Sequence, residues 1–150
     1  MALFTLGVAT GCAGSVAVPV PNPEPTGLTA QACTDLDGAL PSSVLDQVRR
    51  PTEPQSIFTS AYGNSPITVR CGVAVPASLT ATSLLATING IDWLPEQRSA
   101  GYVFTTIGRV ANVEVAVPDA FAPETDVLVD LSPSIEANIP LQAAQSPSAD

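Results

Sequence analysis

Alternating apolar and polar positions predict strands in the middle of the chain. In ITVRCG (residues 67–72) every second residue is apolar, with Cys71 among them, which is the period-two pattern of a strand with one buried face. Residues 99–106 and 109–117 have the pattern of two antiparallel strands with a tight connection at residues 107–108. Cys71 is therefore expected to point into the core.

An Asn-Gly pair at residues 89–90 stands between apolar flanks in SLLATINGIDWLPEQ (residues 83–97). This pair is the strongest short signal for a hairpin, because both residues tolerate a positive φ. Together with the strands above, it predicts a small antiparallel sheet of about four strands.

Helical spacing of apolar residues precedes these strands. A first helix is predicted from Thr29, a residue type that caps helices, to about residue 40. Pro41 interrupts it, and a second short helical turn is predicted over residues 42–50. This turn ends at Arg49 and Arg50, whose positive charges suit the carboxyl end of a helix.

Helical spacing returns after the strands, over residues 123–135, where apolar residues share one face. The run VLVDL allows an alternative, an edge strand followed by a shorter helix capped by Ser132. We favour the helix. The predicted fold is α+β, with helices from the N- and C-terminal parts packed on one face of the sheet.

The 150 residues suffice for one domain, since domains typically have about 100 to 150 residues. We expect residues 31–140 to form it. A signal-peptide-like leader over residues 1–11 and a Pro-rich tether over residues 12–30 precede it, and a disordered tail over residues 141–150 follows.

The leader MALFTLGV is apolar but too short to span a bilayer as a helix, which favours a signal peptide. Small residues come next, and the stretch ATGC places Cys12 where a lipobox has the cysteine that receives diacylglycerol. Nothing before Cys12 is basic, which departs from a usual signal peptide. Lipid anchoring through Cys12 is our first interpretation; secretion by ordinary cleavage and an uncleaved amino-terminal anchor are the alternatives.

The stretch AGSVAVPVPNPEPTGLTA (residues 13–30) has four prolines at alternate positions. Proline fixes φ and disfavours the helical region for its predecessor, so the stretch is expected to be extended, reaching on the order of 50 Å. It is interpreted either as a spacer that holds a domain off a membrane or as a disordered terminus.

Three cysteines divide into one in the leader and two in the body, Cys33 and Cys71. In an oxidising compartment we expect Cys33 and Cys71 to pair and to join the first helix to the sheet. In the cytosol they would be two unpaired buried thiols. A metal site is not expected, because no CxxC spacing is present.

Composition excludes several kinds of chemistry. The chain has five arginines, no lysine and no histidine, against 14 acidic residues, for a formal charge of −9. Ser-His and Cys-His pairs, Schiff bases and imidazole metal ligands are therefore absent, and no cofactor is expected. Binding to nucleic acid is disfavoured, because such binding depends on basic residues that neutralise phosphates.

Five segments in order resemble a known family: CTDLDGALP, RRPTEP, AYGNSPITVRCGV, NGIDWLPE and GYVFTTIGRVANVEVAVP. Together they resemble an uncharacterised actinobacterial envelope family, domain of unknown function 3515, over about residues 31–140. The resemblance implies a lipoprotein or exported protein with an amino-terminal hydrophobic segment and a cysteine pair. It supplies no catalytic residues.

Candidate ligand-binding residues are Arg70, Asp92, Trp93 and Glu96. A tryptophan beside carboxylates suits sugar stacking, and two carboxylates at a suitable separation hydrolyse glycosides. The simpler interpretation is a turn in which Trp93 anchors the core. Arg70 pairs with an acid on the sheet or binds a ligand carboxylate, and Arg109 is interpreted as a solvated charge in the last connection.

These observations favour a non-catalytic cell-envelope protein, lipid-anchored at the outer face of the cytoplasmic membrane or secreted, that contacts an envelope protein or a cell-wall component. The alternative is a small-ligand or carbohydrate binding module that uses Trp93. A wall hydrolase that depends on carboxylates alone is the third candidate.

Overall fold

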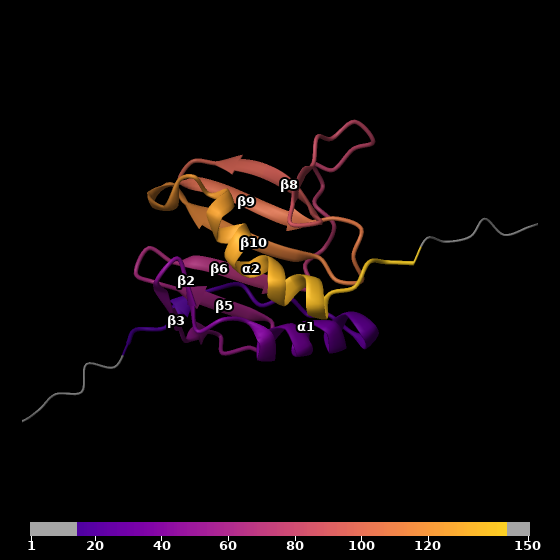
Figure 1. The fold of residues 1–150 in the computed structure, drawn as a ribbon. Helices are drawn as coiled ribbons and strands as arrows, with labels where there is room; N and C mark the ends of the chain where they lie inside the picture. Colours follow the sequence, from indigo (N-terminus) through magenta and orange to yellow (C-terminus); the bar gives the residue numbers. More distant parts are fainter. Residues whose placement is uncertain (1–14, 144–150) are drawn as a thin grey trace, which may run out of the picture.

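The computed structural model describes residues 15–143 and is mostly β (Figure 1). Eight strands form one antiparallel sheet, and the two α-helices lie over one of its faces. The strands in spatial order are β2 (Ser43–Val44), β3 (Gln47–Arg50), β5 (Thr59–Tyr62), β6 (Ile67–Cys71), β10 (Val113–Pro118), β9 (Gly101–Thr106), β8 (Ile91–Arg98) and β7 (Ala86–Ile88). The predicted α+β fold with a sheet of about four strands is therefore wrong.

The clearest error concerns residues 42–50, which form the β2–β3 hairpin and not a helical turn. Leu45 and Asp46 both have positive φ, the conformation of a two-residue hairpin turn. Leucine seldom adopts this conformation, so the sequence gives little sign of it. A residue outside the hairpin stabilises this turn: the backbone N–H of Leu45 donates to Asp130 of the C-terminal helix, 2.9 Å away.

Strand β5 was also missed. All four of its residues, Thr59 to Tyr62, are buried, so it has no exposed face and no alternation of polar and apolar positions. It lies between β3 and β6 inside the sheet. Short strands covered on both faces carry no period-two signal.

The predicted strands and the Asn-Gly hairpin are confirmed. Asn89 and Gly90 both have positive φ and join β7 to β8. Strands β9 and β10 pair in antiparallel fashion, but their connection is longer than the two residues predicted, because β10 starts at Val113. The intervening segment pairs with the residues that follow α2, where Arg109 and Leu141 form an isolated bridge.

Helix α1 (Gly27–Ala39) starts two residues before the predicted cap, and α2 (Thr125–Asn138) confirms the helix favoured over an edge strand. A 3-10 turn, η1 (Asp119–Phe121), connects β10 to α2. The helices bury apolar side chains against the inward residues of the central strands. Among these buried residues are Ala32, Leu36, Leu128, Leu131 and Ile135 from the helices and Ile67, Val69, Val113, Val115 and Val117 from the sheet.

Residues 16–25, called the N-terminal strap, cross the other face of the sheet. β1 (Val18–Pro19) pairs in parallel with β4 (Thr52–Glu53) as a separate two-stranded sheet. Val18 and Val20 bury Ala61 of β5. The folded unit therefore includes residues that the sequence analysis assigned to the tether.

Further contacts hold the strap in place. The carbonyl oxygen of Pro21 accepts a hydrogen bond from Nε of Arg70, 3.0 Å away, and that of Val16 accepts one from Arg50. Pro25 packs against Gly72, which leaves no room for a side chain there. The strap therefore covers β5 and β6 on the face opposite α1.

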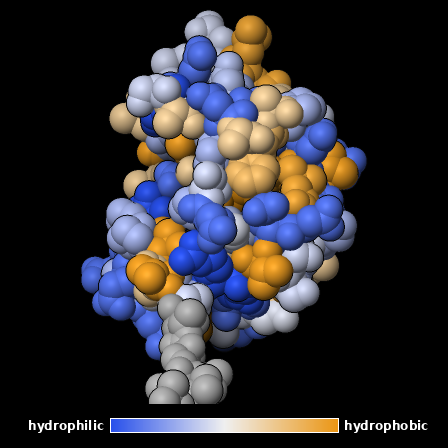
Figure 2. All heavy atoms as spheres, turned by 90° about the vertical axis from the view of Figure 1, so that its left-hand side faces the viewer, coloured by the Kyte–Doolittle hydropathy of each residue, from blue (hydrophilic) through white to orange (hydrophobic). Residues whose placement is uncertain are grey.

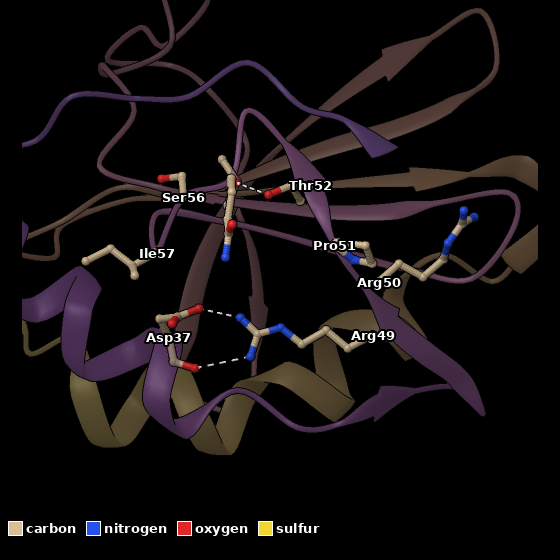
Figure 3. Close-up of a pocket in the computed structure, with 9 residues that line it drawn as sticks. Asp37, Arg49, Arg50, Pro51, Thr52, Ser56 and Ile57 are labelled. Atoms are coloured by element: carbon tan, nitrogen blue, oxygen red, sulfur yellow. Dashed lines mark hydrogen bonds and ion pairs between the residues drawn. The ribbon is translucent and has the colours of Figure 1, made fainter. Parts of the chain in front are cut away.

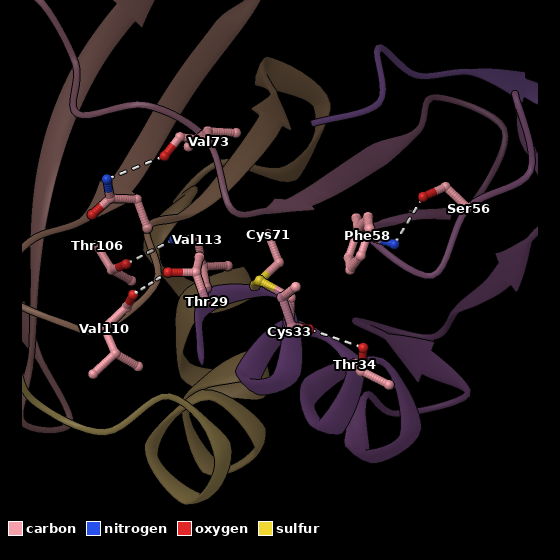
Figure 4. The surroundings of a disulfide bond; sticks show 12 residues. Thr29, Cys33, Thr34, Ser56, Phe58, Cys71, Val73, Thr106, Val110 and Val113 are labelled. Carbon is pink, nitrogen blue, oxygen red and sulfur yellow. Dashed lines mark hydrogen bonds between the residues drawn. A yellow bond between two sulfur atoms is a disulfide. The ribbon is translucent and has the colours of Figure 1, made fainter. Parts of the chain in front are cut away.

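The predicted disulfide is present and joins Cys33 of α1 to Cys71 of β6 (Figure 4). The two Cα atoms are 5.5 Å apart, within the usual range of about 4.4–6.8 Å. Both cysteines are buried, at 1% and 3% exposure. Beside them, Thr29 is not a cap, and its hydroxyl donates instead to the carbonyl oxygen of Val110.

Arg109 is not the solvated charge that the sequence suggested. It is 4% exposed and contacts the end of α2, where it donates to Glu136 and to the carbonyl oxygen of Ile139. Within residues 15–143, none of the helices has the length and apolar character needed to cross a membrane. The predicted leader and Cys12 lie outside the described residues, as do the last seven residues of the predicted tail.

Candidate functional site

The structure separates the four residues proposed from the sequence. Arg70 forms an ion pair with Glu114 on the neighbouring strand β10, at 2.9 Å, and also donates to the strap. Three strand intervals divide β6 from β8, a distance of about 14 Å at ~4.8 Å per interval. Arg70 and the β8 residues therefore do not form one site.

Trp93 is a core residue with no exposed surface. It lies in the cluster between helices and sheet, and its indole Nε1 has no hydrogen-bond partner among the described residues. A sugar ring therefore cannot stack on it in this structure. The simpler interpretation of the NGIDWLPE stretch, a hairpin with a buried anchor, matches the geometry.

Asp92 and Glu96 lie on the opposite face of β8 from Trp93, four residues apart. At ~3.3 Å per residue this is a separation of about 13 Å, beyond the roughly 5–9.5 Å between paired carboxylates in glycosidases. Each also has a partner of its own. Asp92 accepts from Thr87 at 2.5 Å, and Glu96 contacts Ser78 at 2.9 Å.

A hollow lies elsewhere, between the end of α1 and the segment that leads from β3 to β5 (Figure 3). Its volume of about 430 Å³ is in the range of small-molecule sites, roughly 300–1,000 Å³. We call it the Arg49 pocket. It is lined by Asp37, Arg49, Arg50, Pro51, Thr52, Gln55, Ser56, Ile57 and Thr59.

Arg49 is the central side chain of this pocket. It extends from β3 across to α1, where its guanidinium contacts the carboxylate of Asp37 and, at 3.4 Å, the carbonyl oxygen of the same residue (Figure 3). It also donates to Oγ of Ser60 at 2.7 Å. The side chains of Arg49 and Asp37 are 32% and 26% exposed, so this pair remains open to solvent from the pocket.

Alternation along β3 directs the two arginines to opposite faces of the sheet. Arg49 is paired with Tyr62, and Arg50 with Ala61 beneath the strap. The guanidinium of Arg50 therefore points away from the Asp37–Arg49 pair, toward the strap (Figure 3). It donates to the carbonyl oxygen of Gly63 at 3.0 Å, and it has no ion pair with an acidic side chain among residues 15–143.

Tyr62 is fully buried beside the pair, and its hydroxyl donates to the carbonyl oxygen of Pro41 at 3.0 Å. Burial raises the pKa of this hydroxyl above its ordinary value of 10.0; Arg49 lowers it and Asp37 raises it to smaller extents. Tyr62 is therefore a neutral donor that fixes the segment after α1.

Hydroxyl and amide groups form the remaining polar wall. The hydroxyls of Thr52 and Thr59 contact each other at 2.9 Å, and Ser56 accepts from the backbone N–H of Phe58 at 3.0 Å. None of these hydroxyls has a basic partner of the kind that activates a nucleophile. Among the described residues, no group of three or more His, Cys, Asp or Glu side chains is arranged to hold a metal ion.

Sequence analysis missed this site because it placed Arg49 and Arg50 at a helix end. The signal available was the run RRPTEPQS, which combines adjacent arginines with prolines and polar residues. Alternation of the arginines between two faces becomes visible only once the run is assigned to a strand.

The surface on the β2–β3 side of the molecule is mixed in character. Figure 2 views this end, where hydrophobic residues form separate groups between hydrophilic ones. A continuous apolar patch would mark a docking face, and the visible surface at this end does not present one. The Arg49 pocket therefore remains the best candidate site.

Comparison with known proteins identifies the family of this chain. Residues 4–144 match a family described as "Protein of unknown function (DUF3515)". No curated protein matches the chain, and neither does any solved structure. The match spans most of the 150 residues, and the chain therefore belongs to the DUF3515 family.

Proposed function

We propose that this chain is a non-catalytic protein of an actinobacterial cell envelope, either lipid-anchored through Cys12 at the outer face of the cytoplasmic membrane or secreted. Its folded domain contacts an envelope protein or a cell-wall component. The observation that carries the proposal is the disulfide between Cys33 and Cys71. Such bonds persist mainly in oxidising compartments outside the cytosol.

The residue inventory supports the non-catalytic part. The full sequence has no histidine and no lysine, so its serines and threonines lack the usual activating bases. The two carboxylates considered for glycoside hydrolysis, Asp92 and Glu96, each have a separate partner. Burial of Trp93 also removes the support for a carbohydrate module built on that residue.

The strap gives the proposed anchor a short connection. Val18 is the first buried residue of the described chain, six residues after Cys12. Six extended residues span at most about 20–22 Å. A lipid on Cys12 would therefore hold the domain close to the bilayer, with the strap end nearest to it.

Thiol alkylation followed by mass spectrometry tests the compartment. Material from the native host, made from the gene with its own leader, is expected to show Cys33 and Cys71 unmodified by iodoacetamide until a reductant is added. Alkylation of both cysteines before reduction would overturn the proposal.

Metabolic labelling with a palmitate analogue tests the anchor. The wild-type chain is expected to take up label and to sediment with membranes, whereas Cys12→Ser is expected to do neither. Cys33→Ser is the matched control and should keep its label. An unlabelled, secreted wild-type chain would support the secreted form, and label that persists in Cys12→Ser would contradict the assigned position.

A further inference from the structure

One edge of the eight-stranded sheet is only partly covered. Strand β7 pairs with residues 91–93 of β8, whereas β9 pairs with residues 93–98 on the other side of that strand. Residues 95–98 therefore have a strand neighbour on one side only, and β8 lies along the upper margin of the sheet in Figure 1. Pro95, Gln97 and Arg98 are exposed at this edge.

Backbone groups at this edge lack partners. The carbonyl oxygen of Asp92 accepts a hydrogen bond from the backbone N–H of Ile107, on the β9 side. Because backbone groups alternate in direction along a strand, the N–H and C=O of Gln97 and the C=O of Pro95 point outward. No strand within residues 15–143 pairs with these outward groups. An uncovered edge of this kind is a template for another strand.

The order of charges on β8 selects the strand that fits. We propose that β8 pairs in antiparallel fashion with β8 of a second copy of this chain, with the two Gln97 residues opposite each other. Their N–H and C=O groups then exchange two hydrogen bonds across a twofold axis. Glu96 of each copy lies opposite Arg98 of the other, and opposite charges in facing positions stabilise an antiparallel pair. The proposal adds a self-association surface to the envelope protein and does not depend on export or on Cys12.

Glu96 and Arg98 retain atoms for this contact. Within one copy, Nη2 of Arg98 contacts Oε2 of Glu96 at 3.1 Å, and Ser78 donates to the same oxygen at 2.9 Å. Neither contact uses Oε1 of Glu96, and the side chain of Arg98 is 54% exposed. In the pair, each carboxylate therefore lies between two guanidinium groups, and the four side chains carry no net charge.

Neighbouring registers fit less well. Sliding the second copy in one direction places the two Glu96 side chains opposite each other, and sliding it in the other direction does the same with the two Arg98 side chains. Like charges in facing positions destabilise a strand pair. The first of these shifts also places Gln97 opposite Pro95, which has no N–H to donate. Charges and proline commonly keep edge strands from pairing, but their order in β8 leaves this one register open.

Sedimentation equilibrium of the full, oxidised chain tests the pairing. Every chain carries Cys12→Ser, so that neither a lipid nor a third thiol contributes to association. The uncovered segment is short, and we expect a weak dimer with a Kd on the order of 0.1 mM. A chain that stays monomeric at about 1 mM would overturn the proposal.

Charge-exchange variants test the register. Glu96→Arg and Arg98→Glu should each weaken self-association at least about tenfold, because each places like charges opposite each other. An equimolar mixture of the two variants should associate as the wild type does, since every arginine then faces a carboxylate. Asp35→Arg reverses an exposed acid of α1 and is the matched control, which should dimerise like the wild type. Dimers in both single variants, or no association in their mixture, would contradict the pairing.

Gln97→Pro tests the backbone bonds without a change of charge. The N–H of Gln97 points outward, so the folded chain loses no internal hydrogen bond, and Pro95 is already present at this edge. The variant should be monomeric at about 1 mM, whereas Gln97→Thr, the matched control, should dimerise like the wild type. A dimeric Gln97→Pro chain would show that association uses another surface.

Discussion

The two helices lie over the same sheet but are attached to it by different means. Helix α1 is joined covalently, through Cys33 and Cys71. Helix α2 is attached at its C-terminal end by Arg109, which donates to the carbonyl oxygen of Ile139 at 2.6 Å and to Glu136 at 2.5 Å. The disulfide needs only its two cysteines. The polar attachment of α2 needs the several partners that surround the buried guanidinium of Arg109.

The polar attachment also reaches the β7–β8 turn. Nη2 of Arg109 donates to the carbonyl oxygen of Gly90 at 3.4 Å, while its Nε has no partner among the described residues. Its side chain is 2% exposed, but that of Glu136 is 57% exposed, so the ion pair is only half buried. Burial of a charge with incomplete pairing costs stability. Arg109 therefore stabilises the fold chiefly by joining its own segment to the β7–β8 turn and to the end of α2, which no disulfide connects.

The largest effect is expected from breaking the covalent attachment. The double variant Cys33→Ala/Cys71→Ala should lower the free energy of unfolding by about 4 kcal/mol, because the bond closes a loop with a sequence separation of 38. Urea denaturation gives the measurement. The oxidised and reduced wild-type chains serve as controls, and the reduced chain should unfold at the same midpoint as the double variant. An unchanged midpoint on reduction would contradict the role of this bond.

The disulfide was the part of the fold most accessible from sequence. Alternation placed Cys71 on the inward face of its strand, and Cys33, the other cysteine of the body, fell within the predicted first helix. The Asn89–Gly90 hairpin was also found, because its two positive φ values have a local residue signature. In these cases the residues that determine the structure are adjacent or periodic.

The wrong predictions concern residues whose conformation or burial depends on partners far away in the sequence. Arg109 is buried by the Gly90 turn, 19 residues earlier, and by Ile139, 30 residues later, and no local pattern shows this. Likewise, Leu45 adopts its unfavourable turn conformation while Asp130 of α2 accepts its N–H. The Arg49 pocket was missed for the same reason, since Asp37 and Arg49 meet only after β3 is placed beside α1.

The second largest effect is expected from Arg109→Ala, which removes the polar attachment of α2. It should lower the free energy of unfolding by about 2–4 kcal/mol, because the carbonyl oxygens of Gly90 and Ile139 lose a buried donor and the space of the side chain is left empty. Glu136→Gln is the matched control and should cost less than about 1 kcal/mol, since that partner is exposed. Equal losses in the two variants would place the stabilisation in the ion pair itself.

Each attachment has a glycine beside it, Gly72 next to the disulfide and Gly90 next to Arg109, and substitution of these glycines tests the backbone at both places. Gly72 directly follows Cys71 and has φ +91, and a Cβ there would lie 2.6 Å from Pro25 of the strap. Gly90 has φ +78 with nothing within 4 Å. Gly72→Ala should therefore cost about 2–3 kcal/mol and Gly90→Ala about 1 kcal/mol, the difference being the contact with the strap. Thermal unfolding of both variants measures this difference in stability. Equal losses would show that Pro25 and the strap move aside at little cost.

The smallest effect concerns the end of α1, where Tyr62 supplements the disulfide by donating to the carbonyl oxygen of Pro41. Burial raises the pKa of Tyr62 above 10.0 in the folded chain. Above pH 10 the unfolded chain loses this proton before the folded chain does, so the unfolded state binds fewer protons and stability falls as pH rises. Below pH 10 the contribution of this group is complete.

Tyr62→Phe isolates this dependence. At pH 8 it should cost about 1 kcal/mol, because the carbonyl oxygen of Pro41 loses a buried donor. Between pH 10 and 11 the wild type should lose stability more steeply than the variant, in urea denaturation at each pH. Tyr102→Phe removes the other tyrosine hydroxyl and is the matched control; because Tyr62 is still present, this variant should keep the steep wild-type slope. Parallel slopes for the wild type and Tyr62→Phe would mean that the pKa of Tyr62 is the same in the folded and unfolded chains. The end of α1 would then be held by the contact between Arg49 and Asp37, with no contribution from Tyr62.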